Sequence, residues 1–302
     1  MSERILSLAK KKILIVAHRG SFAGNVPCNT LPAYRAALDD GADMIEIDVD
    51  ASADGELFIF HPGMERRHLG YEGSIRKLTG AQVRALRYMN YDRTPTQFPL
   101  NTLDEVLEEF GGKCLINVDK FWENPERIYA AIKRHGLADS IIVKSAPSEH
   151  VLAVLRDLAP DIPYMPIVRS THPMHESFMK SGISYIGAEV LFTDDSEQVA
   201  TDGFIDMMHR DGKLVWVNSI IYNYRDQLAA GHSDDRAVCG DKDGSWGYLA
   251  QKGFDLIQTD WTGKLVQYLD NRGLLYKKAC VFSVTYNTHN YVCPCGQVKF
   301  TM

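Results

Sequence analysis

Short apolar runs alternate along the chain with longer stretches whose apolar residues recur at helical spacing. Nine runs have the length and composition of β-strands: 13–17, 43–49, 57–60, 114–119, 140–144, 164–168, 184–187, 213–217 and 255–259. Stretches with helical spacing are found at 30–39, 102–110, 124–135, 147–158, 173–181, 196–210, 246–252 and 263–272. This alternation predicts βαβ units in an α/β fold with a parallel sheet. Most strand-like runs are apolar on both faces, which is typical of strands buried on both sides.

One pair of runs does not fit a parallel crossover. Only seven residues separate Val49 from Leu57, with Asp54-Gly55 among them. A parallel crossover needs about a dozen residues or more, whereas Asp-Gly between apolar runs is a hairpin signal. We therefore expect 57–60 to return antiparallel to 43–49. Eight strands remain, which predicts a single (β/α)₈ TIM barrel over residues 1–272 with a β-hairpin excursion after its second strand.

Two long segments exceed what a minimal barrel needs. Residues 62–100 are charged and contain several glycines, and residues 219–245 are rich in Asp and Gly. We interpret both as loop insertions, since long loops in compact domains are usually either functional or disordered. The tail, 273–302, has no helical period and receives no assigned structure, and its Cys293-Pro294-Cys295 stays without a role.

Composition narrows the classes of protein that the chain can represent. Its 302 residues are 45% hydrophobic and 24% charged, which excludes a mainly disordered chain. The net charge of -6 disfavours sequence-independent binding of nucleic acid. Six cysteines are too sparse for a disulfide scaffold, and no apolar run approaches ~18 residues. We expect a soluble cytoplasmic protein without membrane insertion whose partner is a small molecule, in an oligomeric state that the sequence leaves open.

Acidic residues mark the carboxyl ends of two predicted strands, where barrels carry their functional groups. Glu46 and Asp48 share one face of a strand because the side-chain period is two, and Asp119 ends another strand. Three carboxylates with no softer ligand suit Mg²⁺ or Ca²⁺. Spacing alone leaves solvated surface acids as the alternative.

Two histidines end predicted strands near these acids. His18 ends the first strand, and the hairpin returns His61 to the level of Glu46 or Asp48. Beside a bound cation they would form a general acid and base pair near neutral pH. A single histidine at a strand end more often has a structural role, which we assign to the other eight.

Three basic residues could reach the same end of the barrel. Arg19, Lys120 and Lys144 follow or end predicted strands. Arg can bind phosphate in bidentate fashion and Lys as a point charge. Ordinary loop solubility is the alternative.

The order of several motifs resembles the glycerophosphodiester phosphodiesterase family over roughly residues 12–272. The matching segments are His18-Arg19-Gly20, Asn29-Thr30, Gly41-Ala42-Asp43 with Glu46 and Asp48, Asp54-Gly55, Phe60-His61, Thr102-Leu103, Asn117 to Lys120, Trp216 to Asn218, and Gly253 to Asp260. The resemblance implies a barrel of the phosphatidylinositol phospholipase C-like type. It implies a divalent cation held by Glu46, Asp48 and Asp119, catalysis by His18 and His61, phosphate binding by Arg19, and Trp216 in the substrate site.

The implied reaction is metal-dependent hydrolysis of a glycerophosphodiester to a glycerol phosphate and an alcohol. The cation would stabilise charge at phosphorus, with His18 favoured as the base and His61 as the acid. One alternative is a related phospholipase C- or D-type enzyme acting on lysolipids or lipid headgroups. Another is a catalytically silent barrel used as a binding module.

The chain departs from the family pattern at three points, of which Cys28 and Pro62 motivate the catalytically silent alternative. Cys28 stands where the family usually has Glu, and Pro62 where it usually has Asp. Asp119 directly precedes Lys120, whereas the family often has Glu-x-Lys. The two histidines and two carboxylates of the family's central set are intact.

Overall fold

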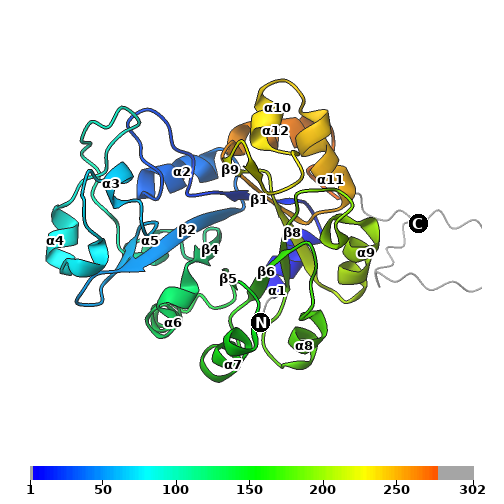
Figure 1. The fold of residues 1–302 in the computed structure, drawn as a ribbon, viewed down its shortest axis with the longest axis horizontal. Helices are drawn as coiled ribbons and strands as arrows, with labels where there is room; N and C mark the ends of the chain where they lie inside the picture. Colours follow the sequence, from blue (N-terminus) through cyan, green and yellow to red (C-terminus); the bar gives the residue numbers. More distant parts are fainter. Residues whose placement is uncertain (1–2, 278–302) are drawn as a thin grey trace, which may run out of the picture.

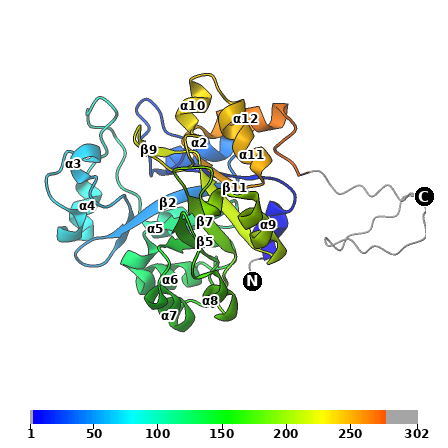
Figure 2. The same ribbon diagram turned by 45° about the vertical axis from the view of Figure 1, so that its right-hand side comes forward.

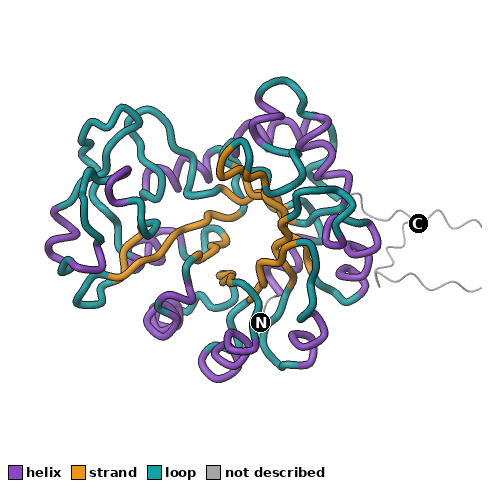
Figure 3. Tube along the Cα trace, viewed as in Figure 1, coloured by secondary structure: helices purple, strands orange, loops and turns teal. Residues whose placement is uncertain are grey.

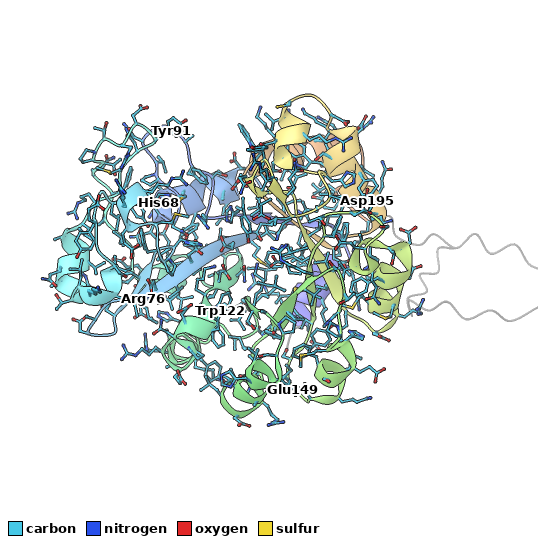
Figure 4. All side chains as sticks on the ribbon, viewed as in Figure 1. His68, Arg76, Tyr91, Trp122, Glu149 and Asp195 are labelled. Atoms are coloured by element: carbon cyan, nitrogen blue, oxygen red, sulfur yellow. The ribbon has the colours of Figure 1, made fainter. Side chains whose placement is uncertain are left out.

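The computed structural model describes residues 3–277, and eight parallel strands close into a barrel within them. The order around the barrel is β1-β11-β8-β7-β6-β5-β4-β2, and β2 pairs with β1 to close it. The strands are β1 (Leu14–Ala17), β2 (Met44–Ala51), β4 (Leu115–Asp119), β5 (Ile141–Ser145), β6 (Tyr164–Arg169), β7 (Gly187–Leu191), β8 (Leu214–Asn218) and β11 (Leu256–Thr259). Figure 3 shows the strands as an inner ring with helices outside it.

A helix follows each barrel strand, so the predicted (β/α)₈ barrel is confirmed. These helices are α2 (Leu31–Asp39), α5 (Leu103–Phe110), α6 (Pro125–Arg134), α7 (Glu149–Leu158), α8 (His175–Lys180), α9 (Asp202–Arg210), α11 (Tyr248–Lys252) and α12 (Thr262–Asn271). Their first turns explain several boundaries. In α5, for example, Thr102 and Glu105 form a capping box that satisfies two backbone N–H groups.

Side chains of each strand alternate between the barrel interior and the layer beneath the helices. Outward residues such as Ile15 and Val217 join the large core cluster with the helices. Inward residues such as Leu14 and Trp216 form a second apolar cluster with Ile5. Ile5 belongs to the additional helix α1 (Glu3–Ala9), which therefore closes the amino-terminal end of the barrel. The interior is apolar at this end.

The hairpin excursion is confirmed. Strand β3 (Leu57–Ile59) pairs antiparallel with the end of β2, with Val49 opposite Ile59. The first insertion continues from it through α3 (Glu65–His68), the 3₁₀ turn η1 (Ile75–Lys77) and α4 (Gly80–Ala85). It packs around a small apolar cluster of its own that includes Phe58, Phe60 and Tyr88. Figures 1 and 2 show α3 and α4 standing away from the barrel on one side.

The second insertion lies between β8 and α11. It contains a short hairpin, β9 (Ile221–Asn223) with β10 (Asp226–Gln227), then α10 (Asp234–Val238) and the π-helical turn η4 (Asp243–Gly247). Two 3₁₀ turns, η2 (Phe121–Glu123) and η3 (Gln198–Ala200), precede α6 and α9. None of the helices in 3–277 is long and apolar enough to cross a bilayer.

One predicted strand is displaced. The sequence predicts a strand over 184–187, but β7 covers Gly187–Leu191. The apolar run at Tyr185 and Ile186 precedes the strand, and Glu189 interrupts the apolar pattern inside it. Glu189 is nevertheless buried, because Lys144 on β5 supplies an opposite charge. Of the predicted tail, residues 278–302 with Cys293 and Cys295 lie outside the described residues.

Candidate functional site

Polar side chains occupy the barrel interior at the carboxyl ends of the strands, beyond the apolar cluster. Their orientation follows from the period of two, because apolar residues an even number of positions earlier on β1, β2, β4, β5, β8 and β11 belong to that cluster, and Glu189 on β7 is paired with inward-facing Trp216. The inward polar residues are His18 after β1, Glu46 and Asp48 on β2, Asn117 and Asp119 on β4, Lys144 on β5, Glu189 on β7, Asn218 on β8, and Gln258 and Asp260 on and after β11.

The three predicted metal ligands lie together. One carboxylate oxygen from each of Glu46, Asp48 and Asp119 lies within 4.8 Å of the others. Burial, and then the charge of Asp48, raises the pKa of Glu46 to about 7. Oδ1 of Asp48 and Oδ1 of Asp119 are buried without a hydrogen-bond donor among the described residues. Mutually repelling acids with unused oxygens could hold a hard divalent cation.

Arg19 holds two of these acids from the first strand. Its backbone N–H donates to Glu46 at 3.0 Å, and its side-chain Nε lies 2.9 Å from Oδ2 of Asp48. The backbone needs a left-handed conformation here, with φ of 58° at Arg19 and 87° at Gly20. A side chain at position 20 would place its Cβ 2.7 Å from the backbone of Ala33, so only glycine fits. The Arg19 Nε thus orients the acids.

Each predicted catalytic histidine has one ring nitrogen engaged. Nδ1 of His18 lies 2.8 Å from Oδ1 of Asp260, and Nδ1 of His61 lies 2.9 Å from the carbonyl oxygen of Pro62. Nε2 of His61 faces Oδ1 of Asp48 at 4.0 Å. Burial lowers the pKa of His18, but the hydrogen bond and charge of Asp260 together with the charge of Glu46 outweigh it, and the net shift is upward. Burial lowers the pKa of His61, and Asp48 offsets this only in part.

Both lysines that the sequence predicts at this end carry a carboxylate partner. Nζ of Lys120 lies 2.5 Å from Oδ2 of Asp119 and 4.0 Å from Oδ1 of Asp48. Lys120 reaches them from a left-handed backbone, with φ of 62°. Nζ of Lys144 lies 2.5 Å from Oε2 of Glu189, and 4.1 Å from the ring centroid of Trp216. Neither ammonium group is a free positive charge.

Trp216 lies deeper than its predicted role requires. Its ring is fully buried in the interior cluster beneath Lys144, and its Nε1 donates to Oδ1 of Asn218 at 3.2 Å. A period of two on β8 turns the ring into the barrel rather than toward a loop. The ring supports the polar layer from below, and substrate contact by Trp216 stays a prediction.

Several residues of this layer were assigned no role in the sequence analysis. Asp260 partners His18, while Glu189, Asn218 and Gln258 line the interior on β7, β8 and β11. The available signal was a polar residue at an inward position within an otherwise apolar strand. Cys28, which replaces the family's usual Glu, is buried, and burial raises the pKa of its thiol to about 12.

Comparisons with known proteins found a matching family model and several similar phosphodiesterases. A family model described as a domain of unknown function, DUF4996, matches residues 164–269. A glycerophosphodiester phosphodiesterase of Caldanaerobacter subterraneus is 30% identical over 159 residues, which cover 50% of this chain and 65% of that protein. Over this range the chain is similar to a named glycerophosphodiester phosphodiesterase. Its match extends over a little less than two thirds of that relative's length.

Solved structures of phosphodiesterases share the fold of this chain. A glycerophosphoryl diester phosphodiesterase from Parabacteroides distasonis has a TM-score of 0.74 at 19% identity, and the match covers 90% of this chain and 93% of that one. A phosphodiesterase from Oleispira antarctica, solved in complex with the product sn-glycerol-3-phosphate, has a TM-score of 0.63 at 21% identity, covering 86% and 97%. At these identities the likeness establishes the barrel alone.

Proposed function

We propose that the protein hydrolyses glycerophosphodiesters to a glycerol phosphate and an alcohol with the help of a divalent cation. The observation that carries the proposal is the arrangement at the carboxyl end of the barrel, where Asp48 lies beside His61 and two further acids. The relative from Caldanaerobacter bears the name of this activity, and the Oleispira phosphodiesterase holds a glycerol phosphate product. Both support the proposed substrate class.

The donor set fits Mg²⁺ or Ca²⁺. Glu46, Asp48 and Asp119 offer only oxygen, and two of their buried oxygens have no donor among the residues described. The chemistry that such an ion supplies is electrostatic stabilisation of charge on the phosphate. Burial, and then the charge of Asp48, raises the pKa of Glu46, so its ionised form is unfavourable in this site. A bound cation would stabilise that ionised form.

The two histidines are placed for proton transfer through Nε2. Because Asp260 binds Nδ1 of His18, it would hold the ring in the tautomer whose Nε2 accepts a proton, as suits a general base. The carbonyl oxygen of Pro62 would likewise fix Nδ1–H of His61 and leave Nε2 toward the acids, where it would protonate the leaving alcohol. We therefore propose His18 as the general base and His61 as the general acid.

The cytoplasmic location of the protein stays a prediction.

A screen for metal-dependent turnover tests the proposal. Purified protein with Mg²⁺ or Ca²⁺ is assayed on glycerophosphodiesters, lysolipids and cyclic phosphodiesters, with products identified by mass spectrometry. Release of glycerol phosphate supports the proposal, and exclusive turnover of lysolipids would favour the phospholipase alternative. Calorimetric titration of the ion into the wild-type protein, with Glu46→Gln as the control, tests the alternative of a catalytically silent barrel. Absence of ion binding by the wild type would favour that alternative.

A further inference from the structure

The barrel interior has a second polar group across from the acids. In the closed order of strands, β7 and β8 lie opposite β2 and β4. Glu189, Asn218 and Gln258 face inward on β7, β8 and β11, and each is at least nine-tenths buried. Asn218 and Gln258 are paired across β8 and β11. The Glu46, Asp48 and Asp119 cluster needs none of these three side chains.

A chain of contacts orients two of these residues. Nε1 of Trp216 donates to Oδ1 of Asn218, and Nδ2 of Asn218 donates to Oε1 of Glu189 at 2.6 Å. Nζ of Lys144 pairs with the other carboxylate oxygen, Oε2. A carboxylate oxygen accepts two hydrogen bonds, so Oε2 retains capacity for a further donor. The pair of Glu189 and Lys144 is neutral as a unit.

Gln258 is the member of the group whose buried oxygen has neither a hydrogen-bond donor nor an ion-pair partner among the described residues, whereas the buried Oε2 of Glu189 has Lys144 beside it. The side chain of Gln258 is 4% exposed, and its Oε1 is buried with no hydrogen-bond donor in residues 3–277. A buried amide oxygen without a donor costs about 1–3 kcal/mol, so natural proteins rarely keep one for stability. It lies two residues before Asp260, the partner of His18, on the same face of the chain. A ligand held near His18 would therefore lie next to this amide.

We propose that Glu189, Asn218 and Gln258 form a subsite that binds the hydroxyl groups of a polyol in the diester. The proposal rests on the proposed function and names its substrate class. A hydroxyl both donates and accepts, which complements the Gln258 amide and the free capacity of Glu189. A quaternary ammonium headgroup has no donor to offer. A primary ammonium would add a cation beside Lys144, whose charge Glu189 already balances.

The first test compares substrates with and without hydroxyls. Gln258→Leu removes the amide and keeps the shape, and Gln258→Met provides a second variant of similar volume. We measure kcat/KM for glycerophosphoglycerol, glycerophosphocholine and bis(p-nitrophenyl) phosphate. Gln267→Leu, at an exposed position of α12, is the matched control. The ratio of hydroxylated to hydroxyl-free diester should fall by about 10- to 100-fold in the Gln258 variants and stay at the wild-type value in the control.

The substrates also distinguish the two sources of hydroxyls. A loss on both glycerophosphodiesters assigns the subsite to the glycerol half that they share. A loss confined to glycerophosphoglycerol assigns it to the leaving alcohol. An unchanged ratio in both Gln258 variants would overturn the subsite.

Binding without turnover separates this inference from the proposed function. Calorimetry with Mg²⁺ present compares sn-glycerol 3-phosphate with methyl phosphate, which lacks free hydroxyls. Wild type should prefer the glycerol ester, and Gln258→Leu should lose that preference while melting at or above the wild-type temperature. A preference without diester turnover refutes the proposed function and leaves a polyol phosphate site. Turnover with no preference refutes the subsite alone.

Discussion

Asp234, which begins α10, joins the second insertion to the candidate site, and its loss should lower both stability and activity. Its carboxylate is buried and accepts four hydrogen bonds. The donors to Oδ1 are Ser219 Oγ, Trp246 Nε1 and Thr259 Oγ1, and the donor to Oδ2 is the backbone N–H of Asp260 at 2.8 Å. Asp260 in turn binds His18. Asp234→Asn is the perturbation that tests this connection.

The size of the effect follows from which bond the amide breaks. In Asp234→Asn the amide oxygen can keep the three donors of Oδ1, which leaves the amide NH₂ facing the N–H of Asp260. One hydrogen bond to a charged acceptor is lost, at about 1.5–3 kcal/mol. Burial raises the pKa of Asp234, so the ionised form already bears a desolvation cost and we expect the lower end of this range. A shift of about 1 Å at His18 would lower kcat/KM by about 100-fold.

Urea unfolding and a pH profile of kcat/KM measure the two effects. Asp235→Asn is the matched control, because Asp235 is the exposed neighbour on the same first turn of α10. It removes the same charge near the helix terminus, a change worth about 0.3–1 kcal/mol. The reasoning is refuted if Asp234→Asn and Asp235→Asn have equal unfolding free energies and equal kcat/KM.

Four further outcomes are expected. His61→Ala should lower kcat by about 10²- to 10⁴-fold, measured on glycerophosphodiesters, because it removes a proton-transfer group. Mg²⁺ at 100 times its Kd should raise the unfolding free energy by about 2.7 kcal/mol, and Asp48→Asn should abolish the rise in thermal melts. Without metal, Asp260→Asn should destabilise the protein most below pH 6.5, the ordinary pKa of His18, because Asp260 stabilises the protonated ring. The destabilisation should fade as the pH rises through the raised pKa of His18 in the folded protein. Urea unfolding at several pH values measures it. Phe60→Ala, in the first insertion's core, should cost about 3–5 kcal/mol in unfolding free energy, measured in urea.

A specific result would refute each of these four predictions. Wild-type turnover in His61→Ala would remove it from catalysis, and a metal-induced rise in Asp48→Asn would place the ion elsewhere. A pH-independent effect of Asp260→Asn would mean that the contact does not depend on the charge of His18. Phe22→Ala, at a side chain 44% exposed, is the control for Phe60→Ala, and equal costs would show that the insertion has no cooperative core.

Much of the barrel could be predicted because its signals are local. The seven residues between Val49 and Leu57 exclude a parallel crossover, and the structure has the hairpin there. The alternation of apolar runs with helical stretches located seven of the eight barrel strands to within one or two residues. The exception is β7, where buried Glu189 breaks the apolar pattern. From sequence alone, a charged residue argues against a buried strand, because the partner that balances its charge is not known.

The candidate site divides in the same way. Glu46 and Asp48 were predictable as neighbours, because two residues of separation on a strand place side chains on one face. The pairing of His18 with Asp260, 242 residues apart, had no local signal. The same holds for Lys144 with Glu189, and for the burial of Trp216 beneath them.

The sequence by itself determined the strand count, the hairpin and the residue types at each strand end, because periodicity and turn chemistry act over a few residues. Only the tertiary structure decided which charges neutralise one another. Closing the barrel sets β7 and β8 across from β2 and β4, so it fixes which side chains share the interior. That closure leaves Asp48, Asp119 and Gln258 with unused buried oxygens, and long-range packing rather than sequence spacing creates them.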